Sequence, residues 1–328
     1  MEGSSVVVIG GGTGTFPVIS ALKQQPVHLT SIIAVSDSGG STGRIRDEFG
    51  FQPVGDLRQA LAALAQAEGE EWIRKILLYR FEKGNGLKGH NLGNLILTAL
   101  QDMTGDTTQA LDIAEKVFRL EGEVVPATSD NVQLEITYTD GSVAVGEHLL
   151  DEEGDHTQPV KSIRSVRLIP EARVSPKAAK AIEEAQLIVI GPGDYYASLM
   201  ASLLPEGMSQ AFAKTSAKIV YMVNLMTRLT QTNGMSARQH VEGIEKVIGR
   251  KVDYIIISNG SIPQDILDVY AASNEFPVND DLGNDPQVIR ADLVSEEVNH
   301  KSTVDTAHRS LLRHDVNKVG QVLRELLQ

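Results

Sequence analysis

Short apolar segments alternate with longer segments of helical periodicity along most of the chain. Strands that are apolar throughout are typical of parallel sheets, which are covered on both faces. Five such strand-sized segments lie at 6–9, 32–35, 187–190, 219–223 and 252–257. Helical segments are predicted at 56–67, 92–100, 178–185 and 317–327. This alternation predicts a Rossmann-like, doubly wound α/β fold with a mostly parallel sheet.

Two regions depart from that alternation. In 132–150 the apolar residues alternate with polar ones on either side of Asp140-Gly141, a pair that is typical of a hairpin turn. Residues of about 56–119 are rich in helical patterns and contain no strand pattern. We therefore expect one Rossmann-like domain over 1–328, with a helical cluster at about 56–119 and a small antiparallel β insert at about 121–170.

The net charge, the cysteine count and the length of the apolar runs exclude several classes of protein and of functional site. With 30 basic and 43 acidic residues the net charge is −13, which argues against a nucleic-acid-binding protein. The chain has no cysteine, which excludes disulfides, thiolate metal sites and thiol nucleophiles. Apolar runs are far shorter than the roughly 20 residues of a membrane span, and a secretory signal pattern is absent from the first residues. We expect a cytoplasmic protein, and a homo-oligomer is an option that the sequence leaves open.

Glycine-rich turns follow three of the predicted strands, at 10–15, 36–44 and 191–194. Glycine lets backbone amides approach a ligand closely, and a following helix N-terminus favours negative charge. Ligands of open α/β sheets bind beyond the carboxyl ends of the strands, where the strand order reverses. The turns therefore predict one crevice shaped for phosphate, with a helix starting at Pro17. Its candidate residues are Gly11, Gly12, Thr13, Gly14, Thr15, Asp37, Gly39, Gly40, Ser41, Arg44, Gly191, Pro192 and Gly193.

Any one of these turns has other interpretations. A tight turn without a ligand is the simplest of them. The first turn fits a dinucleotide-binding pattern only in part, because Thr15 stands at the third glycine position. It is also similar to the tubulin-type GTPase signature, which lies behind earlier strands in those proteins, whereas here it follows the first strand. Three turns in one chain favour a shared ligand site over these alternatives.

Several polar residues beside the turns suggest chemistry. Asp37 and Asp56 are candidate Mg²⁺ ligands, because hard cations prefer oxygen ligands. Alternatively, Asp56 caps the helix that begins at Leu57, and one carboxylate can do both. Arg44 suits a phosphate, as does the neighbouring Arg46. His90, in a further glycine-rich loop, is either a source of charge or a proton, or a structural residue.

The motifs occur in an order that resembles one family. They are Val-Val-Val-Ile-Gly-Gly-Gly-Thr-Gly-Thr at 6–15, the turns at 39–44 and 55–58, the segment 83–94, Ile-Gly-Pro-Gly at 190–193, Asn-Leu-Met-Thr at 224–227 and Arg-His-Asp at 313–315. Together they resemble the gluconeogenesis factor family (YvcK-like), a branch of the CofD-like group that includes 2-phospho-L-lactate transferase. The resemblance runs from residue 6 to about 327.

The resemblance implies a protein that binds a UDP-sugar, chiefly UDP-N-acetylglucosamine. It also implies a cytoplasmic regulator that links carbon metabolism during gluconeogenic growth to cell-envelope synthesis and cell shape. In such proteins a tyrosine and the arginine of the Arg-His-Asp motif help to hold the nucleotide sugar, and these fall on Tyr270 and Arg313. Other motif residues expected at the ligand are Asn91, Asn94, Asn224 and Thr227.

This chain departs from the family pattern in places that concern its chemistry. The family has two adjacent aspartates before the glycine-serine turn, whereas here Asp37 is followed by Ser38. Asn91 replaces a serine, and Arg228-Leu229 replaces Gln-Pro. A non-catalytic regulator that binds a UDP-sugar is thus the favoured hypothesis. A CofD-like transferase with Mg²⁺ on Asp37 and Asp56 is the alternative, and a dinucleotide-dependent reductase is a remote third.

Overall fold

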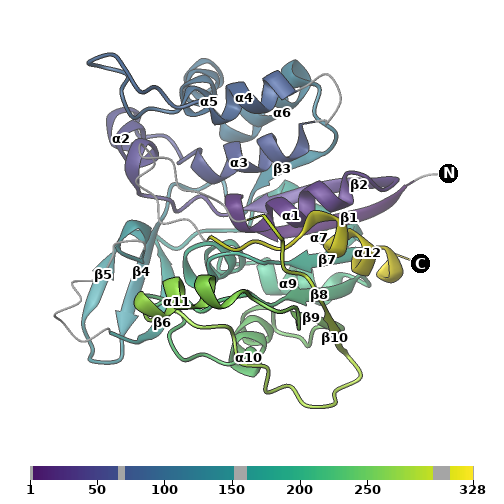
Figure 1. Ribbon diagram of the computed structural model, residues 1–328. Helices are drawn as coiled ribbons and strands as arrows, with labels where there is room; N and C mark the ends of the chain where they lie inside the picture. The colour runs from purple at the N-terminus through teal and green to yellow at the C-terminus, as the bar shows by residue number, and fades with distance from the viewer. Residues whose placement is uncertain (1–2, 66–70, 151–160, 298–310, 328) are drawn as a thin grey trace.

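A seven-stranded sheet organises the protein. The computed structural model describes residues 3–65, 71–150, 161–297 and 311–327. Every pair of neighbouring strands in this sheet is parallel, in the order β10-β9-β8-β7-β1-β2-β3 (Figure 1). The strands are β1 (Ser4–Gly10), β2 (Val27–Ile33), β3 (Glu123–Pro126), β7 (Leu187–Ile190), β8 (Lys218–Met222), β9 (Tyr254–Ser258) and β10 (Val288–Ala291). The order grows outward in both directions from β1 and β7, which confirms the predicted doubly wound fold.

The sequence pattern located the central strands better than the outer ones. β7 has the predicted bounds, and β1, β8 and β9 overlap their predicted segments. β2 is displaced towards the N-terminus because Ala34 and Val35 are buried beyond the end of the ladder. The short edge strands β3 and β10 were not predicted. β3 lies inside the range assigned to the insert but pairs with β2 in the main sheet.

Helices cover both faces of the sheet, so each central strand contributes to two apolar layers. In β1, Val6 and Val8 pack on one side, whereas Val7 and Ile9 pack on the other. The first layer is covered by α1 (Gly12–Leu22), α3 (Gly55–Leu64) and α12 (Val316–Leu326). The second is covered by α7 (Pro176–Glu184), α9 (Met208–Lys214) and α10 (Ala237–Ile248). Burial on both faces explains why these strands are apolar throughout.

The predicted helical cluster stands beyond β3 at one end of the sheet (Figure 1). It comprises α3, α4 (Glu71–Leu78), α5 (Leu92–Thr104) and α6 (Thr107–Phe118), and α2 (Gly40–Phe49), which precedes the predicted bounds, packs on α5. The side chains of Asn91 and Asp106 accept backbone N–H groups at the starts of α5 and α6, and each thereby satisfies one unpaired donor. Leu57, Leu61 and Leu64 of α3 are buried, as their spacing predicts.

The predicted hairpin forms a separate antiparallel sheet. Its strands β4 (Gln133–Tyr138) and β5 (Val143–Val145) join through Asp140-Gly141, with Gly141 at a φ of +85°. A third strand, β6 (Ile163–Ile169), pairs with the other edge of β4. The one-turn helix η1 (Glu147–Leu150) follows β5. The insert therefore starts at β4 and not at residue 121.

Three shorter helices complete the fold near the carboxyl ends of the strands. They are the π-helix η2 (Tyr195–Met200), which continues into α8 (Ala201–Leu203), and α11 (Gln264–Ala272). Within the described ranges, the helices are too short or too polar to cross a membrane.

Candidate functional site

The carboxyl ends of β1, β7 and β8 bring three predicted segments together. β1 and β7 are neighbours at the point where the strand order reverses. A side chain on Gly14 would collide with the backbone of Gly193, so the two glycine turns touch. At the end of β8, the Asn224 side chain accepts the Gly193 N–H at 3.3 Å and donates to the Gly193 carbonyl at 2.8 Å. The turns after β1 and β7 and Asn224 after β8 therefore converge at the switch point of the sheet, as the sequence predicted, and their role as ligand contacts stays a prediction.

The first glycine turn is itself the beginning of a helix. α1 starts at Gly12, with Gly11 in an extended conformation before it, so the predicted start at Pro17 is wrong and Pro17 lies inside the helix. The buried Thr15 hydroxyl donates to the Gly11 carbonyl at 3.1 Å and fixes the turn. The amides of Gly12, Thr13 and Gly14 are consequently the N-terminal amides of α1, which carry its positive dipole end.

Asp56 faces this helix N-terminus. Its carboxylate accepts the Gly12 N–H. The N-cap position of α3 is Val54, which makes no side-chain cap, so the predicted role of Asp56 as the cap of its own helix is wrong. Burial, together with the nearby carboxylates of Asp37 and Asp194, raises the pKa of Asp56 to about 7.

Asp37 adds a second carboxylate to the floor of the crevice. Its Oδ1 accepts the Gly39 N–H at 2.8 Å, and its Oδ2 lies 2.5 Å from the point where a side chain on Gly55 would begin. Burial raises the pKa of Asp37, whereas the Gly39 and Thr42 hydrogen bonds and the charges of Arg58 and Arg46 oppose that rise. We call Asp37, Asp56 and Asp194 the acidic floor.

Two residues of the acidic floor, Asp37 and Asp56, are the predicted Mg²⁺ ligands. Over the described ranges, no group of three or more histidine, aspartate or glutamate side chains is arranged to hold a metal. Mg²⁺ commonly uses only one or two carboxylates and completes its shell with water and ligand phosphates. Asp37 and Asp56 fit that arrangement, since they are close enough for the charge of Asp37 to raise the pKa of Asp56. The Mg²⁺ site stays a prediction.

Behind the floor, two predicted ligand residues serve the scaffold. Asn94 is buried, accepts from Arg58 Nε at 2.7 Å and donates to the Thr42 hydroxyl at 3.3 Å. Asn91 caps α5 by accepting the Asn94 N–H at 3.2 Å. His90 is half-buried, and its backbone carbonyl accepts the Phe81 N–H at 2.9 Å. The predicted ligand role of the His90 side chain remains a prediction.

The glycine-serine turn is only partly described. Gly39 precedes the first residue of α2, so Gly40, Ser41 and Arg44 belong to the N-terminal half of that helix. The side-chain placement of these three residues lies outside what the structure describes. Their predicted role as ligand contacts therefore stays a prediction.

The two residues that the resemblance singled out are connected. The Tyr270 hydroxyl, on α11, accepts the Leu312 N–H at 3.0 Å, so Tyr270 holds the segment that carries Arg313. The next residue, His314, is buried, and burial lowers its pKa to about 4, so its side chain is neutral at pH 7. Asp315 Oδ1 accepts two N–H groups at 2.9 Å and begins α12. The Arg-His-Asp motif thus fixes the backbone on both sides of Arg313.

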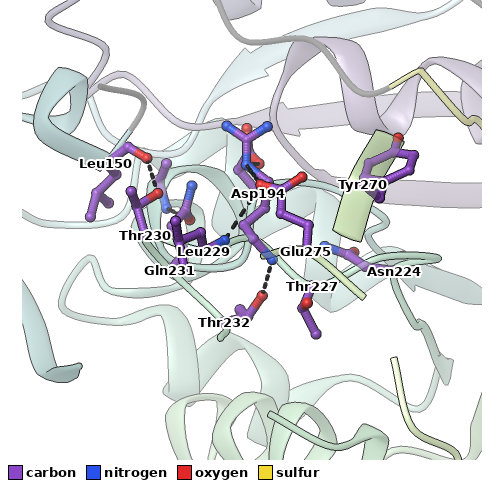
Figure 2. A network of polar contacts seen from close by, with 12 residues as sticks. Leu150, Asp194, Asn224, Thr227, Leu229, Thr230, Gln231, Thr232, Tyr270 and Glu275 are labelled. Carbon is purple, nitrogen blue, oxygen red and sulfur yellow. Dashed lines mark hydrogen bonds and ion pairs between the residues drawn. The ribbon is translucent and has the colours of Figure 1, made fainter. Parts of the chain in front are cut away.

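A buried ionic network borders the crevice at its β8 end (Figure 2). Arg228 Nε lies 3.8 Å from Asp194 Oδ1 and 3.9 Å from Glu275 Oε1. The Thr227 hydroxyl accepts the Phe276 N–H at 3.0 Å, which ties β8 to the segment after α11. Figure 2 shows Asn224, Thr227 and Tyr270 around this network. Thr227, predicted as a ligand contact, is 3% exposed and engaged in this scaffold.

A cleft of about 770 Å³ opens on the α1 side of the crevice. It is lined by Thr13, Phe16, Arg58, Gln59, Ala62, Arg74, Leu78, Tyr79, Arg80, Phe81, Glu82, Lys83, Asn91 and Arg313. Among these lining residues, five are cationic and only Glu82 is anionic, in a chain of net charge −13. We call this cavity the basic cleft. Thr13, Asn91 and Arg313 are the sequence-predicted ligand residues that line it.

Sequence reasoning missed most of the basic cleft. Arg58 lay in a quoted motif without a role, and Arg74, Arg80 and Lys83 were not singled out. One signal was available for Arg74: it precedes Leu77 and Leu78 by three and four residues, which places a cation on the inward face of α4. A cation among apolar positions is costly to bury unless an acidic side chain or an anionic ligand pairs with it.

Comparisons with known proteins agree with this geometry. The family model described as 2-phospho-L-lactate transferase CofD matches residues 6–298. The gluconeogenesis factor of Bacillus subtilis (strain 168) is 35% identical over 325 residues, covering 98% of each chain. The gluconeogenesis factor of Listeria innocua is 34% identical over 327 residues, covering 98% of this chain and 95% of the other. The crystal structure of a UPF0052 family member from Bacillus halodurans superposes with a TM-score of 0.87 at 33% identity, covering 99% of both chains.

Proposed function

The chain belongs to the gluconeogenesis factor family within the CofD group, and from that premise we propose that it binds a nucleotide sugar of the UDP-N-acetylglucosamine type. In this proposal the diphosphate lies against the first turn of α1 at Thr13, and Gly191 to Gly193 border the same end of the sheet. Arg313 contributes a forked donor that suits phosphate.

One observation carries the proposal: the N-terminal turn of α1 and the basic cleft share Thr13. Helix N-terminal amides and arginine side chains are the two groups that proteins most often present to phosphate. Here Thr13, in the first turn of α1, lines a cavity that is also lined by five cationic side chains. Its volume of about 770 Å³ lies in the range of small-molecule sites, roughly 300–1,000 Å³.

The proposal is tested by a thermal-shift screen of nucleotide sugars followed by calorimetry. UDP-N-acetylglucosamine is expected to raise the melting temperature by ligand linkage and to be recovered intact after incubation. UDP alone serves as the control for the contribution of the sugar. If no nucleotide sugar shifts the melting temperature at millimolar concentration, the proposal fails.

We further propose a regulatory role rather than a metabolic reaction. The support is the full-length similarity to gluconeogenesis factors, together with Ser38, which follows Asp37 where the resemblance implies a second aspartate. In this role the bound UDP-sugar reports carbon status to cell-envelope synthesis and cell shape. Expression in Bacillus subtilis that lacks its own gluconeogenesis factor is expected to restore growth on a gluconeogenic carbon source. The Arg313→Ala variant, expressed at the same level, is expected to fail, and equal rescue by both would contradict the role.

The acidic floor favours one alternative, a CofD-like transferase with a nucleoside diphosphate-linked donor. In such a reaction an acceptor hydroxyl oxygen bonds to the transferred phosphorus while the bond to the departing nucleoside monophosphate breaks. Asp56, with a pKa of about 7, is suited to accept the hydroxyl proton, and Asp37 would share Mg²⁺ with the phosphates. The alternative requires Mg²⁺-dependent release of a nucleoside monophosphate that disappears in Asp37→Ala. Equal release by the variant and the wild type would remove it.

A further inference from the structure

The basic cleft has features that a structural role alone does not explain. Arg58 is committed to the scaffold, because it donates to Asn94 at 2.7 Å and to the Leu77 carbonyl at 3.1 Å. Arg74 differs: it is half-buried, and its guanidinium lies 4.2 Å from the centre of the Phe16 ring. In the described part of the chain, no carboxylate lies within ion-pair distance of Arg74.

An arginine that is partly removed from water without an acidic partner is costly to the folded state. Burial lowers the pKa of Arg74, and no charge among the described residues opposes that shift. Lys83 and Arg313 line the same cavity and add to the positive potential. A bound anion would relieve the mutual repulsion of these groups, so the arrangement indicates an anionic ligand.

The acidic floor shows where that anion does not lie. Asp56 already accepts the Gly12 N–H, and Asp37 and Asp194 stand beside it. A phosphate placed there would meet carboxylates, whereas a phosphate on the far side of Thr13 meets the cations of the basic cleft. Charge therefore divides the site into two halves with Thr13 between them.

The cleft also has an apolar wall for the rest of a metabolite. Phe16, Tyr79 and Phe81 line it, and the last two rings meet edge to face with centroids 5.1 Å apart. Tyr79 is 51% exposed beside the opening. Aromatic rings that border cations suit a ligand with a planar or carbon-rich body and a charged end.

We propose that the basic cleft is a phosphoryl-binding site, in which Arg74, Lys83 and Arg313 hold the phosphate or diphosphate of an anionic metabolite. Two sources share this chemistry: the diphosphate of the proposed nucleotide sugar, and a separate phosphorylated metabolite. In the first case the inference rests on the proposed function and states on which side of Thr13 the diphosphate lies. In the second it stands independently of the nucleotide.

The test is calorimetric titration of the full-length protein with inorganic pyrophosphate at low ionic strength. The wild type is expected to bind it. Affinity is expected to fall about tenfold in Arg74→Gln and about threefold in Lys83→Gln, as for lost charge-assisted contacts. Lys83 is exposed, so its variant keeps the fold even if Arg74→Gln does not. Arg173→Gln, whose side chain is 85% exposed on the surface, is the control and should bind as the wild type does.

Repeating the titration with saturating UDP-N-acetylglucosamine separates the two sources. Competition assigns the cleft to the diphosphate of the nucleotide, and unchanged pyrophosphate binding assigns it to a second metabolite; either result supports the site. Absence of pyrophosphate binding to the wild type, or equal affinity in Arg74→Gln, Lys83→Gln and Arg173→Gln, overturns the inference. If pyrophosphate binds but no nucleotide sugar does, the proposed function fails and the phosphoryl site stands.

Discussion

The basic cleft and the acidic floor have opposite charge and meet at the start of α1, where Thr13 lines the cleft and the Gly12 N–H donates to Asp56. In the cleft, five cations face a cavity, and Arg74 lacks an acidic partner in the described residues. On the floor, Asp37 and Asp56 are half-buried and have raised pKa values. The cleft therefore suits an anion, whereas the raised pKa values on the floor suit a proton or a cation. The proposed nucleotide sugar has both kinds of group, an anionic diphosphate and a sugar rich in hydrogen-bond donors.

The largest effect is expected where the two glycine turns meet. In Gly14→Val, the new side chain would occupy the position of the Gly193 backbone and the Pro192 carbonyl. We expect nucleotide-sugar binding to be lost and the free energy of unfolding to fall by about 3 kcal/mol, as for severe overpacking. Urea denaturation measures the second quantity. Gly86→Ala is the matched control, because nothing lies within 4 Å of its added carbon; equal effects of both substitutions would contradict the contact.

The next largest effect, on ligand affinity, is expected from Arg313, which both the proposed function and the phosphoryl-binding site require. Arg313→Ala is expected to weaken UDP-N-acetylglucosamine binding by about 1.5–3 kcal/mol, the value of a hydrogen bond to a charged group. Calorimetry measures the change, and Arg313→Lys should recover only part of it because lysine lacks the forked geometry. Unchanged affinity in Arg313→Ala would remove this residue from the site.

On the acidic floor, the expected effect is on the pH dependence of stability. The pKa of Asp56 in the folded protein, about 7, exceeds its ordinary value of 3.8. Between these values the folded state holds a proton that the unfolded state has lost, so stability falls as the pH rises through this window. The stability of Asp56→Asn relative to the wild type should therefore be higher at pH 8 than at pH 5, by roughly 2–3 kcal/mol for the two pH units between 5 and 7.

Glu115 provides the control for that pH experiment. Burial raises its pKa to about 7 as well, and its carboxylate accepts the Val124 N–H at 2.6 Å, away from the site. Asp56→Asn should remove only part of the pH dependence, and Glu115→Gln another part. Ligand binding should change only in the first variant. The same stability difference between Asp56→Asn and the wild type at pH 5 and pH 8 would disprove the raised pKa.

The smallest effect is expected from a residue that acts through Arg313. Tyr270→Phe removes the hydroxyl that accepts the Leu312 N–H and should weaken binding by about 1 kcal/mol. Because Tyr270 positions Arg313, Tyr270→Phe should cause little further loss of affinity in a protein that already carries Arg313→Ala. A double-mutant cycle measures this coupling. Fully additive losses would mean that Tyr270 contacts the ligand independently.

Much of the fold and part of the site could be predicted from the sequence. Strands buried on both faces, such as β7, are apolar throughout and have clear bounds. The edge strands β3 and β10 are short and include Glu123 and Arg290, so they lack such a signal. The glycine turns predicted the crevice because parallel strands end on one edge.

The remainder of the site depends on contacts that local patterns do not encode. Asp56 appeared to be the cap of its own helix, but it accepts an N–H from α1, a pairing that arises only when α1 packs on α3. Similarly, Arg74 and Arg313 are far apart in sequence and meet at one cavity only in the folded chain. The spacing of the glycines identified the backbone amides of the candidate site. The charged side chains around these amides could be located only in the folded structure.

A crystal structure of the complex with UDP-N-acetylglucosamine tests the central claim most directly. We predict that the diphosphate lies between the Thr13 amide and the guanidinium groups of the basic cleft, within hydrogen-bond reach of Arg313. The sugar should then face the acidic floor. A diphosphate found beside Asp194, or out of reach of both the Thr13 amide and Arg313, would contradict the account.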